Sequence, residues 1–253
     1  MIKAPVVVIG IGEMGSVFAR GLLRTGHPVY PVIRTTDMHA LADSINEPDM
    51  VLIAVGEAVL QEMLTQIPEQ WKDKLALLQN ELLPSDYATI NNPTVISVWF
   101  EKKKGQDSKV LVPSPVFGPN APLLQNALNS LDISSKLISN DADMLFELVV
   151  KNVYIVTTNI AGLRAGGTVG ELWEQHQDFA RAVISDVIAI QEALSGKQFD
   201  HATVIKAMLE AFEGDLQHNC MGRSAPARLQ RALEHAEQHN LDVPTLREIA
   251  AEQ

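Results

Sequence analysis

The sequence has few of the features that mark extracellular or membrane proteins. Its 253 residues include a single cysteine, Cys220, so the chain cannot form an internal disulfide and an oxidising extracellular scaffold is disfavoured. Aromatic residues make up only 5% of the chain. We see no cleavable leader before the strand-like residues Val6–Ile9 and no apolar run long enough to span a bilayer. We therefore expect a cytoplasmic protein without a membrane partner.

Positive charge is scarce as well. The chain has 20 Lys and Arg residues against 31 Asp and Glu, which gives a formal net charge of −11. Such a molecule repels the phosphate backbone of nucleic acids, so we expect no nucleic-acid partner. What remains is ordinary globular composition, 46% hydrophobic and 20% charged, at a length that allows two domains or one large α/β domain.

The order of the apolar runs predicts an α/β chain with two parts. Short β-branched runs alternate with helical patterns at first, which is typical of a parallel sheet covered by helices; the predicted strands are residues 6–9, 29–33, 50–55, 76–78, 95–100 and 110–112, with a proline-rich loop at 113–119. From Asp141 the periodicity is helical, with predicted helices 141–162, 171–196, 201–213, 227–240 and 244–252. We place the domain boundary at 140/141.

A glycine triplet follows the first predicted strand. Gly10, Gly12 and Gly15 form Gly-x-Gly-x-x-Gly, with Glu13 and Met14 opening the next helix. In a dinucleotide-binding fingerprint the three glycines serve the tight turn, the close approach of a pyrophosphate, and helix–strand packing. We therefore predict a Rossmann domain with a doubly wound sheet over residues 1–140. The alternative is a glycine-rich turn that only packs tightly.

The residue that ends the second predicted strand indicates which dinucleotide binds. NAD-binding domains usually carry an acid there, whereas this chain has Arg34. A guanidinium can make a charge-assisted contact with a 2′-phosphate, so we predict NADP(H) as the cofactor. In the alternative interpretation, Arg34 is a surface residue and Asp37 supplies the acid.

The predicted helix 141–162 is apolar nearly all round, yet it contains Lys151. At helical spacing Thr158 lies close to the Lys151 direction, with Ile155 and Asn159 flanking, so an ammonium, a hydroxyl and an amide would face one cleft. Desolvation lowers the pKa of a lysine, which suits proton donation to a developing alkoxide. Equally, Lys151 could snorkel to solvent along the domain seam.

Taken together, these motifs resemble ketopantoate reductase, a family of the 6-phosphogluconate dehydrogenase-like superfamily. The resemblance runs over nearly the whole chain. Besides the fingerprint and Arg34 it rests on Gln79-Asn80, Gly118-Pro119, the helix with Lys151 and Asn159, and the late segment 239–244. It implies an all-helical domain over 141–253 for substrate binding and dimerisation. It also implies hydride transfer from NADPH to a small keto acid, with Lys151 as general acid, Asn159 holding substrate and Asn80 near the nicotinamide ribose.

The chain departs from the family at three functional positions. Gly56 stands where the family usually has a lysine, Ile155 where it has an asparagine, and Ser224 where it has the glutamate that binds the substrate diol. Asn219, Arg223 and Ser224 are candidates for a different recognition surface, or for a loop with packing roles.

We accordingly expect an NADP(H)-dependent reductase acting on a carbonyl or imine of a small polar substrate other than ketopantoate, without a metal site. A homodimer is favoured, with the oligomeric state left open. The alternative is a sensor or scaffold that binds the dinucleotide without turnover.

Overall fold

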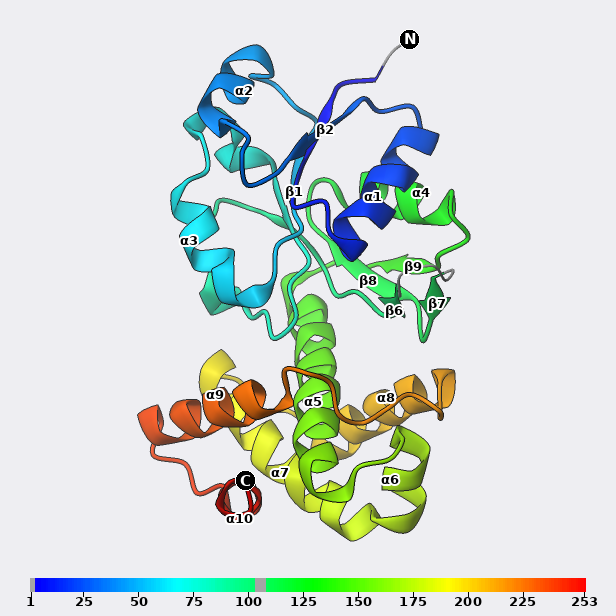
Figure 1. Cartoon of the computed structure of the whole chain (residues 1–253), viewed down its shortest axis with the longest axis vertical. Coiled ribbons are helices and arrows are strands. Elements are labelled where there is room, and N and C mark those ends of the chain that lie inside the picture. The colour runs from blue at the N-terminus through cyan, green and yellow to red at the C-terminus, as the bar shows by residue number, and fades with distance from the viewer. Residues whose placement is uncertain (1–2, 103–107) are drawn as a thin grey trace. The chain divides into compact units, whose positions relative to one another are not determined.

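The computed structural model describes residues 3–102 and 108–253 (Figure 1). The chain forms two compact units, Met1–Glu147 and Leu148–Gln253. The division falls inside helix α5 (Asp141–Ala165), whereas the boundary expected from sequence lies at the start of that helix. The functions assigned to the two domains stay predictions.

The first unit is built on a seven-stranded sheet with the order β2-β1-β3-β4-β5-β8-β9. Neighbouring strands are parallel except β5 and β8, which are antiparallel. The central strands are fully buried, as expected for apolar runs covered on both faces. The strands are β1 (Val6–Ile9), β2 (Val29–Val32), β3 (Met50–Ile53), β4 (Leu75–Leu77), β5 (Thr94–Ile96), β8 (Ser114–Phe117) and β9 (Ser135–Leu137).

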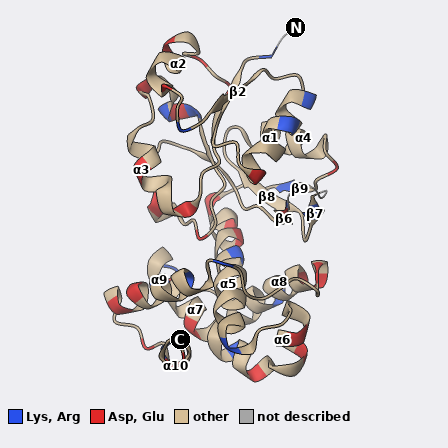
Figure 2. Ribbon diagram, viewed as in Figure 1, with Lys and Arg blue, Asp and Glu red and all other residues tan. Residues whose placement is uncertain are grey.

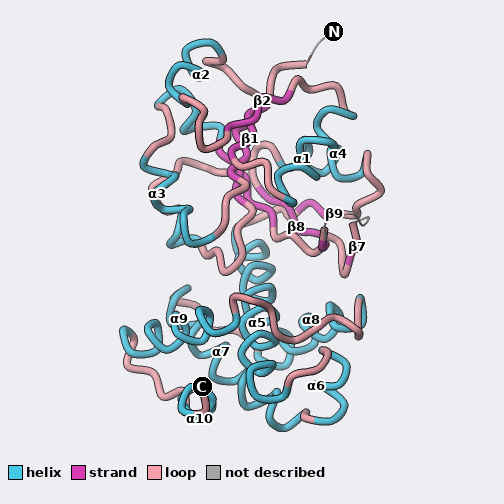
Figure 3. Tube along the Cα trace, in the orientation of Figure 1, coloured by secondary structure: helices cyan, strands magenta, loops and turns pink. Residues whose placement is uncertain are grey.

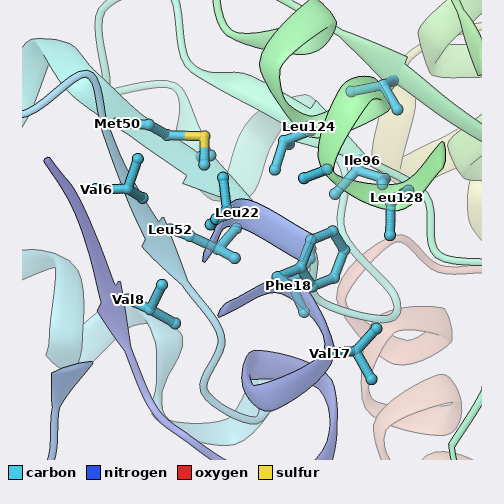
Figure 4. Close-up of a cluster of buried hydrophobic side chains, with 14 of the residues drawn as sticks. Val6, Val8, Val17, Phe18, Leu22, Met50, Leu52, Ile96, Leu124 and Leu128 are labelled. Carbon is cyan, nitrogen blue, oxygen red and sulfur yellow. The ribbon is translucent and has the colours of Figure 1, made fainter. Parts of the chain in front are cut away.

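Helices cover both faces of this sheet. On one face α1 (Glu13–Arg24) packs against α4 (Ala121–Asn129), and α2 (Met38–Ser44) and α3 (Leu60–Thr65) lie on the other side of the strands (Figure 1). The α1 face holds a core cluster in which Phe18 and Leu22 meet the strand residues Val6, Val8 and Leu52 (Figure 4). Three 3-10 turns, Glu57–Val59, Glu69–Lys74 and Pro84–Tyr87, complete the connections.

The region after β5 differs from the sequence prediction. Strand 95–100 is interrupted, because β5 ends at Ile96 and β6 (Phe100–Glu101) pairs instead with β7 (Lys109–Val110). The predicted loop at 113–119 is wrong, since it contains β8. Proline lacks an N–H, yet the Pro115 carbonyl still accepts a hydrogen bond from the Ser97 N–H at 3.0 Å, so the proline does not exclude the strand. Strand β9 and helix α4 were not predicted.

The second unit consists of helices joined by loops (Figure 3). Helix α7 (Gln177–Ser195) contacts α6 (Val169–Gln175), α8 (His201–Gly214), α9 (Ala225–Gln238) and α10 (Pro244–Ala251). The single helix predicted over 171–196 is wrong, because it is two helices separated at His176, whose φ of −130° and ψ of 33° are not helical. The predicted fold class, a Rossmann sheet followed by a helical part, is confirmed.

The expectation that no apolar run is long enough to cross a membrane is wrong for helix α5. Its 25 residues are long and apolar enough, but 72% of the apolar window is buried inside the structure. The Asn152 side chain donates to the Gln191 Oε1 at 2.9 Å, and the Tyr154 ring lies 5.6 Å from that of Phe212. These contacts show that α5 is packed as the core helix of the second unit.

Candidate functional site

The strand order creates a crevice at one edge of the sheet. From β1 the chain goes to β2 on one side and then crosses to β3 on the other, and in open α/β sheets ligands bind outside the carboxyl ends of the strands at such a switch point. A pocket of about 580 Å³ lies there. It is lined by Ile9, Gly10, Ile11, Gly12, Val32, Ile33, Arg34, Thr36, Met38, Val55, Gly56, Val59, Glu62, Met63 and Gln66.

The fingerprint glycines divide into two kinds. Gly10 has φ +93°, and a Cβ there would come within 2.8 Å of the Ala54 carbonyl oxygen. A Cβ on Gly15 would press into the Gly10 carbonyl oxygen, far inside van der Waals contact. Both glycines are therefore required by the fold itself. At Gly12, by contrast, a Cβ would meet no atom within 4 Å, so this position is open toward the pocket.

Helix α1 starts directly after Gly12 and presents its N-terminus to this region. No side chain caps the helix at Gly12, and the predicted cofactor residues Glu13 and Met14 lie in its first turn but not on the pocket lining. An uncapped helix N-terminus offers amide donors and the positive end of the helix dipole. The open position and the amides together suit the pyrophosphate of a dinucleotide.

Arg34 projects from a tight turn at the end of β2. The turn is closed by the Ile33 N–H donating to the Thr36 Oγ1 at 3.0 Å and by the Thr36 N–H donating to the Ile33 carbonyl at 2.9 Å. Arg34 is exposed and lines the pocket. Within residues 3–102 and 108–253 no carboxylate forms an ion pair with it. Its positive charge is thus available to a ligand.

Asp37, the alternative ribose-binding acid, has another function in the structure. Its Oδ1 accepts hydrogen bonds from the backbone N–H groups of His39 and Ala40, each at 3.0 Å, and so caps the N-terminus of α2. Of the two candidates, Arg34 lies on the pocket lining and Asp37 does not.

Gln79 supports one wall of the pocket, although the sequence indicated it only through the family resemblance. The side chain is 6% exposed, and its Nε2 donates to the carbonyls of Ile53 at 2.7 Å and Val55 at 3.1 Å. Gln79 therefore ties the end of β4 to the loop after β3, which forms one wall of the pocket. Asn80 follows it at the carboxyl end of β4, half-buried and outside the pocket lining.

On α5 the three predicted polar residues have different surroundings. Thr158 is 1% exposed, and its hydroxyl donates to the Tyr154 carbonyl at 2.8 Å, within its own helix. Lys151 is half-buried, with its Nζ 5.7 Å from the centroid of the Tyr154 ring. Asn159 is half-buried and donates through its Nδ2 to the Ile155 carbonyl at 2.9 Å. The shared cleft of these three side chains stays a prediction.

Asn159 and Ser224 are brought together by a residue that the sequence did not single out. The Nη1 of Arg228 donates to the Asn159 Oδ1 at 3.0 Å and to the Ser224 Oγ at 2.6 Å. Arg228 is only 7% exposed. In the sequence, Arg228 is an arginine within the amphipathic pattern of α9. Surface arginines give the same pattern, so the sequence does not distinguish Arg228 from them.

The other predicted residues near α9, Asn219 and Arg223, lie at the surface. Asn219 is exposed and its backbone bridges to Thr168, and Arg223 is exposed. Between them lies Cys220, which is 1% exposed, and burial raises the pKa of its thiol to about 11. A thiol in that state is not a nucleophile near neutral pH. Gly56 lines the pocket at the β1 switch point, and Ile155 is buried at 8% exposure.

Among the described residues, charges of one sign do not form a single patch in the view of Figure 2. In the view of Figure 2, Lys and Arg segments are interspersed with Asp and Glu segments over both units. Among the described residues, no three His, Cys, Asp or Glu side chains are grouped so that they could hold a metal ion.

Comparison with known proteins shows the fold. No protein-family model and no curated protein matches the sequence. Solved structures do match over nearly the whole chain. The 2-dehydropantoate 2-reductase of Methylococcus capsulatus is 15% identical, with 98% of this chain and 94% of that chain covered and a TM-score of 0.71. A dimeric ketopantoate reductase of Staphylococcus aureus is 18% identical, with 98% and 96% covered and a TM-score of 0.63.

A third similar structure is D-mandelate dehydrogenase in complex with NADH. It is 13% identical, with 98% of this chain and 96% of that chain covered and a TM-score of 0.69. The chain thus has the fold of these reductases and dehydrogenases, and the resemblance found in the sequence is confirmed at the level of the fold.

Proposed function

We propose that this protein is an NADP(H)-dependent oxidoreductase that reduces a carbonyl or imine group of a small polar substrate. The observation that carries the proposal is the pocket at the β1 switch point. There the open face of Gly12 lies on the same lining as the guanidinium of Arg34, which has no ion pair within the described part of the chain. The solved structures with this fold support it, since they are described as reductases or as a dehydrogenase with NADH.

The residues of the first unit fit a dinucleotide. The amides at the start of α1 would bind the pyrophosphate at Gly12, and Arg34 would bind the 2′-phosphate of the adenosine ribose. Three apolar side chains that are unusually exposed, Ile11 at 39%, Ile33 at 56% and Val59 at 45%, line the same pocket and would contact the adenine ring. Asn80, at the end of β4, is assigned to the nicotinamide ribose.

Lys151 is assigned the proton transfer. Bound NADPH supplies the hydride, and a substrate carbonyl then needs a proton at the oxygen that becomes a hydroxyl. Lys151 is a half-buried lysine in the apolar middle of α5, and its ammonium would polarise the carbonyl and deliver this proton. Asn159 would orient the substrate, whereas the Thr158 hydroxyl is buried and bonded to the Tyr154 carbonyl.

The test is a titration with NADPH followed by a screen of small carbonyl compounds in which NADPH oxidation is monitored. Lys151→Ala should lower turnover by about 10²–10⁴, as expected for loss of a general acid, with NADPH affinity near wild type. Lys206→Ala removes an exposed lysine of α8 and serves as the matched control.

Two results would contradict the proposal. Turnover within a few-fold of wild type in Lys151→Ala would show that this lysine only snorkels. NADPH binding without oxidation of any compound in the screen would favour the alternative, a dinucleotide-binding sensor or scaffold. We also propose a homodimer, as described for the Staphylococcus aureus enzyme, which sedimentation velocity would test.

A further inference from the structure

Part of the lining of the pocket at the β1 switch point is apolar and open to solvent. Ile33 and Val59 line the pocket although they are 56% and 45% exposed, and the half-buried Met38 and Met63 line it as well. Ile33 and Met38 follow β2, whereas Val59 and Met63 follow β3, and these two strands flank β1 in the sheet. Apolar side chains therefore border the pocket from either side of β1. This arrangement suits a flat aromatic ring, to which methionine adapts well.

Helix α3 and the residue after it add a polar pair to the same lining. Glu62 and Gln66 are both exposed, both line the pocket, and lie about one helical turn apart. The Gln66 Nε2 donates to the Glu62 Oε1 at 3.3 Å, so an amide nitrogen and a carboxylate oxygen are adjacent. A carboxylate has about four acceptor sites and an amide nitrogen has a second hydrogen, so both side chains can also bond a ligand. Among the described residues, no Lys, Arg or His side chain forms an ion pair with Glu62.

The carboxylate of Glu62 restricts which ligand fits. A carboxylate repels the phosphate groups of a dinucleotide, so it is favourable in such a pocket only where the ligand offers it a hydrogen-bond donor. The donors of a dinucleotide are its ribose hydroxyls, the carboxamide of nicotinamide and the amino group of adenine. Arg34, on the same lining, is assigned to the adenosine ribose, so the ring that meets the apolar side chains is adenine. Its amino group is then the donor that an acceptor beside Met63 would bind.

We propose that Glu62 and Gln66 recognise the adenine base of the dinucleotide: Glu62 accepts a hydrogen bond from the exocyclic amino group, and Gln66 donates to a neighbouring ring nitrogen. The amino group of adenine lies between two ring nitrogens that accept hydrogen bonds, which matches an acceptor and a donor held side by side. Hypoxanthine carries an oxygen where adenine carries the amino group, and that oxygen would face the carboxylate. Glu62 is therefore the residue that selects adenine. The proposal rests on the proposed function, since it takes the ligand of this pocket to be a dinucleotide.

The test compares NADPH with its deamino analogue, reduced nicotinamide hypoxanthine dinucleotide phosphate, which differs only in the base. Both contain the same reduced nicotinamide, so one fluorescence titration of the full chain measures both dissociation constants. Wild type should bind NADPH about tenfold more tightly than the analogue, because the analogue loses a hydrogen bond to a charged group. Glu62→Gln should reduce this preference to about twofold or less, since an amide can turn its N–H groups toward the oxygen of hypoxanthine.

Matched variants separate base recognition from other effects. Glu69→Gln removes a carboxylate that is 83% exposed and lies outside the pocket lining, and it should keep the preference. Gln66→Ala removes the donor and should weaken NADPH severalfold, which tests the pair a second time where Glu62→Gln does not fold. Thermal denaturation of each variant reports on folding.

Three results would overturn the proposal. The first is equal binding of the two dinucleotides by wild type. The second is an undiminished preference in folded Glu62→Gln, together with unchanged NADPH binding in Gln66→Ala. The third is equal weakening of both dinucleotides in Glu62→Gln, because that result would place Glu62 at a ribose hydroxyl, which both ligands share.

Failure of the proposed function would look different. If wild type binds neither NADPH nor its deamino analogue, the dinucleotide site falls and base recognition falls with it. If wild type binds both with the same affinity, the dinucleotide site stands and only the recognition of adenine by Glu62 and Gln66 falls.

Discussion

Replacing Arg34 with alanine tests the cofactor assignment most directly. Arg34 stands on the Ile33–Thr36 turn, is exposed, and within the described part of the chain has no carboxylate partner. Its removal therefore breaks no ion pair, and the turn itself is held by the backbone of Ile33 and the Thr36 hydroxyl. We expect Arg34→Ala to fold with wild-type stability and to differ only toward a ligand that carries the 2′-phosphate.

The magnitude follows from the exposure of the side chain. A hydrogen bond to a charged group contributes about 1.5–3 kcal/mol, and solvent screening at an exposed arginine places the effect at the lower end of that range. Since 1.4 kcal/mol corresponds to a factor of ten, the NADPH dissociation constant should rise about tenfold. That of NADH should change by less than about twofold, because NADH has no 2′-phosphate for Arg34 to bind.

The assay is a fluorescence titration of wild type and variants with NADPH and with NADH at two salt concentrations. Higher salt should shrink the wild-type preference for NADPH, because an exposed charge pair is screened. Arg24→Ala is the control: it removes the same charge from the last turn of α1, at the opposite end of that helix from Gly12, and should leave both affinities unchanged.

Either of two results would refute this reasoning. If wild type binds NADH as tightly as NADPH, Arg34 does not select the cofactor and Asp37 becomes the residue to test. If Arg34→Ala weakens both dinucleotides equally, the arginine supports the pocket rather than the 2′-phosphate.

Three further predictions concern the glycine turn, the pocket wall and a buried carboxyl group. Gly12→Val should keep the unfolding temperature, since the new side chain enters open space, and should weaken NADPH binding about tenfold or more. Gly15→Ala should lower the unfolding temperature, because the new Cβ would clash with the Gly10 carbonyl oxygen. Equal losses of stability for the two variants in thermal denaturation would contradict this. Gln79→Leu deprives the buried Ile53 carbonyl and the part-buried Val55 carbonyl of their donor. It should lower stability by about 1–3 kcal/mol and weaken NADPH binding, unlike Gln125→Leu, which breaks one bond of 3.3 Å; unchanged NADPH affinity would refute the role in the pocket wall. Burial raises the pKa of Asp186, which accepts a hydrogen bond from the Leu246 N–H, so the folded chain binds a proton more readily than the unfolded one. Stability should therefore fall as the pH rises from the ordinary aspartate pKa through the raised one, and this fall should be absent in Asp186→Asn. The measurement is the free energy of unfolding from denaturant titrations across the acidic range. The same pH dependence in wild type and Asp186→Asn would count against this prediction.

Much of the first unit followed from local patterns. Runs such as Val6–Ile9 are apolar on both faces, which indicates a parallel strand, and the glycine spacing identifies the turn after it. Strand β8 was missed because prolines at 113 and 115 suggest a loop, and only its pairing with β5 and β9 shows that the N–H that Pro115 lacks is not needed. The break at His176 was missed because helical periodicity continues across it.

For the candidate site, the sequence by itself predicted the residues that a local pattern marks: the glycines of the fingerprint, the strand-end Arg34, and the lysine on an apolar helix. Only the tertiary structure decided between residues that chemistry alone allows. It assigned Asp37 to the α2 cap, made Gln79 the link between two strand ends, and brought Arg228 of α9 to Asn159 of α5. The physical reason is that a hydrogen bond between side chains 69 residues apart depends on how helices pack, and no periodicity within either helix records it.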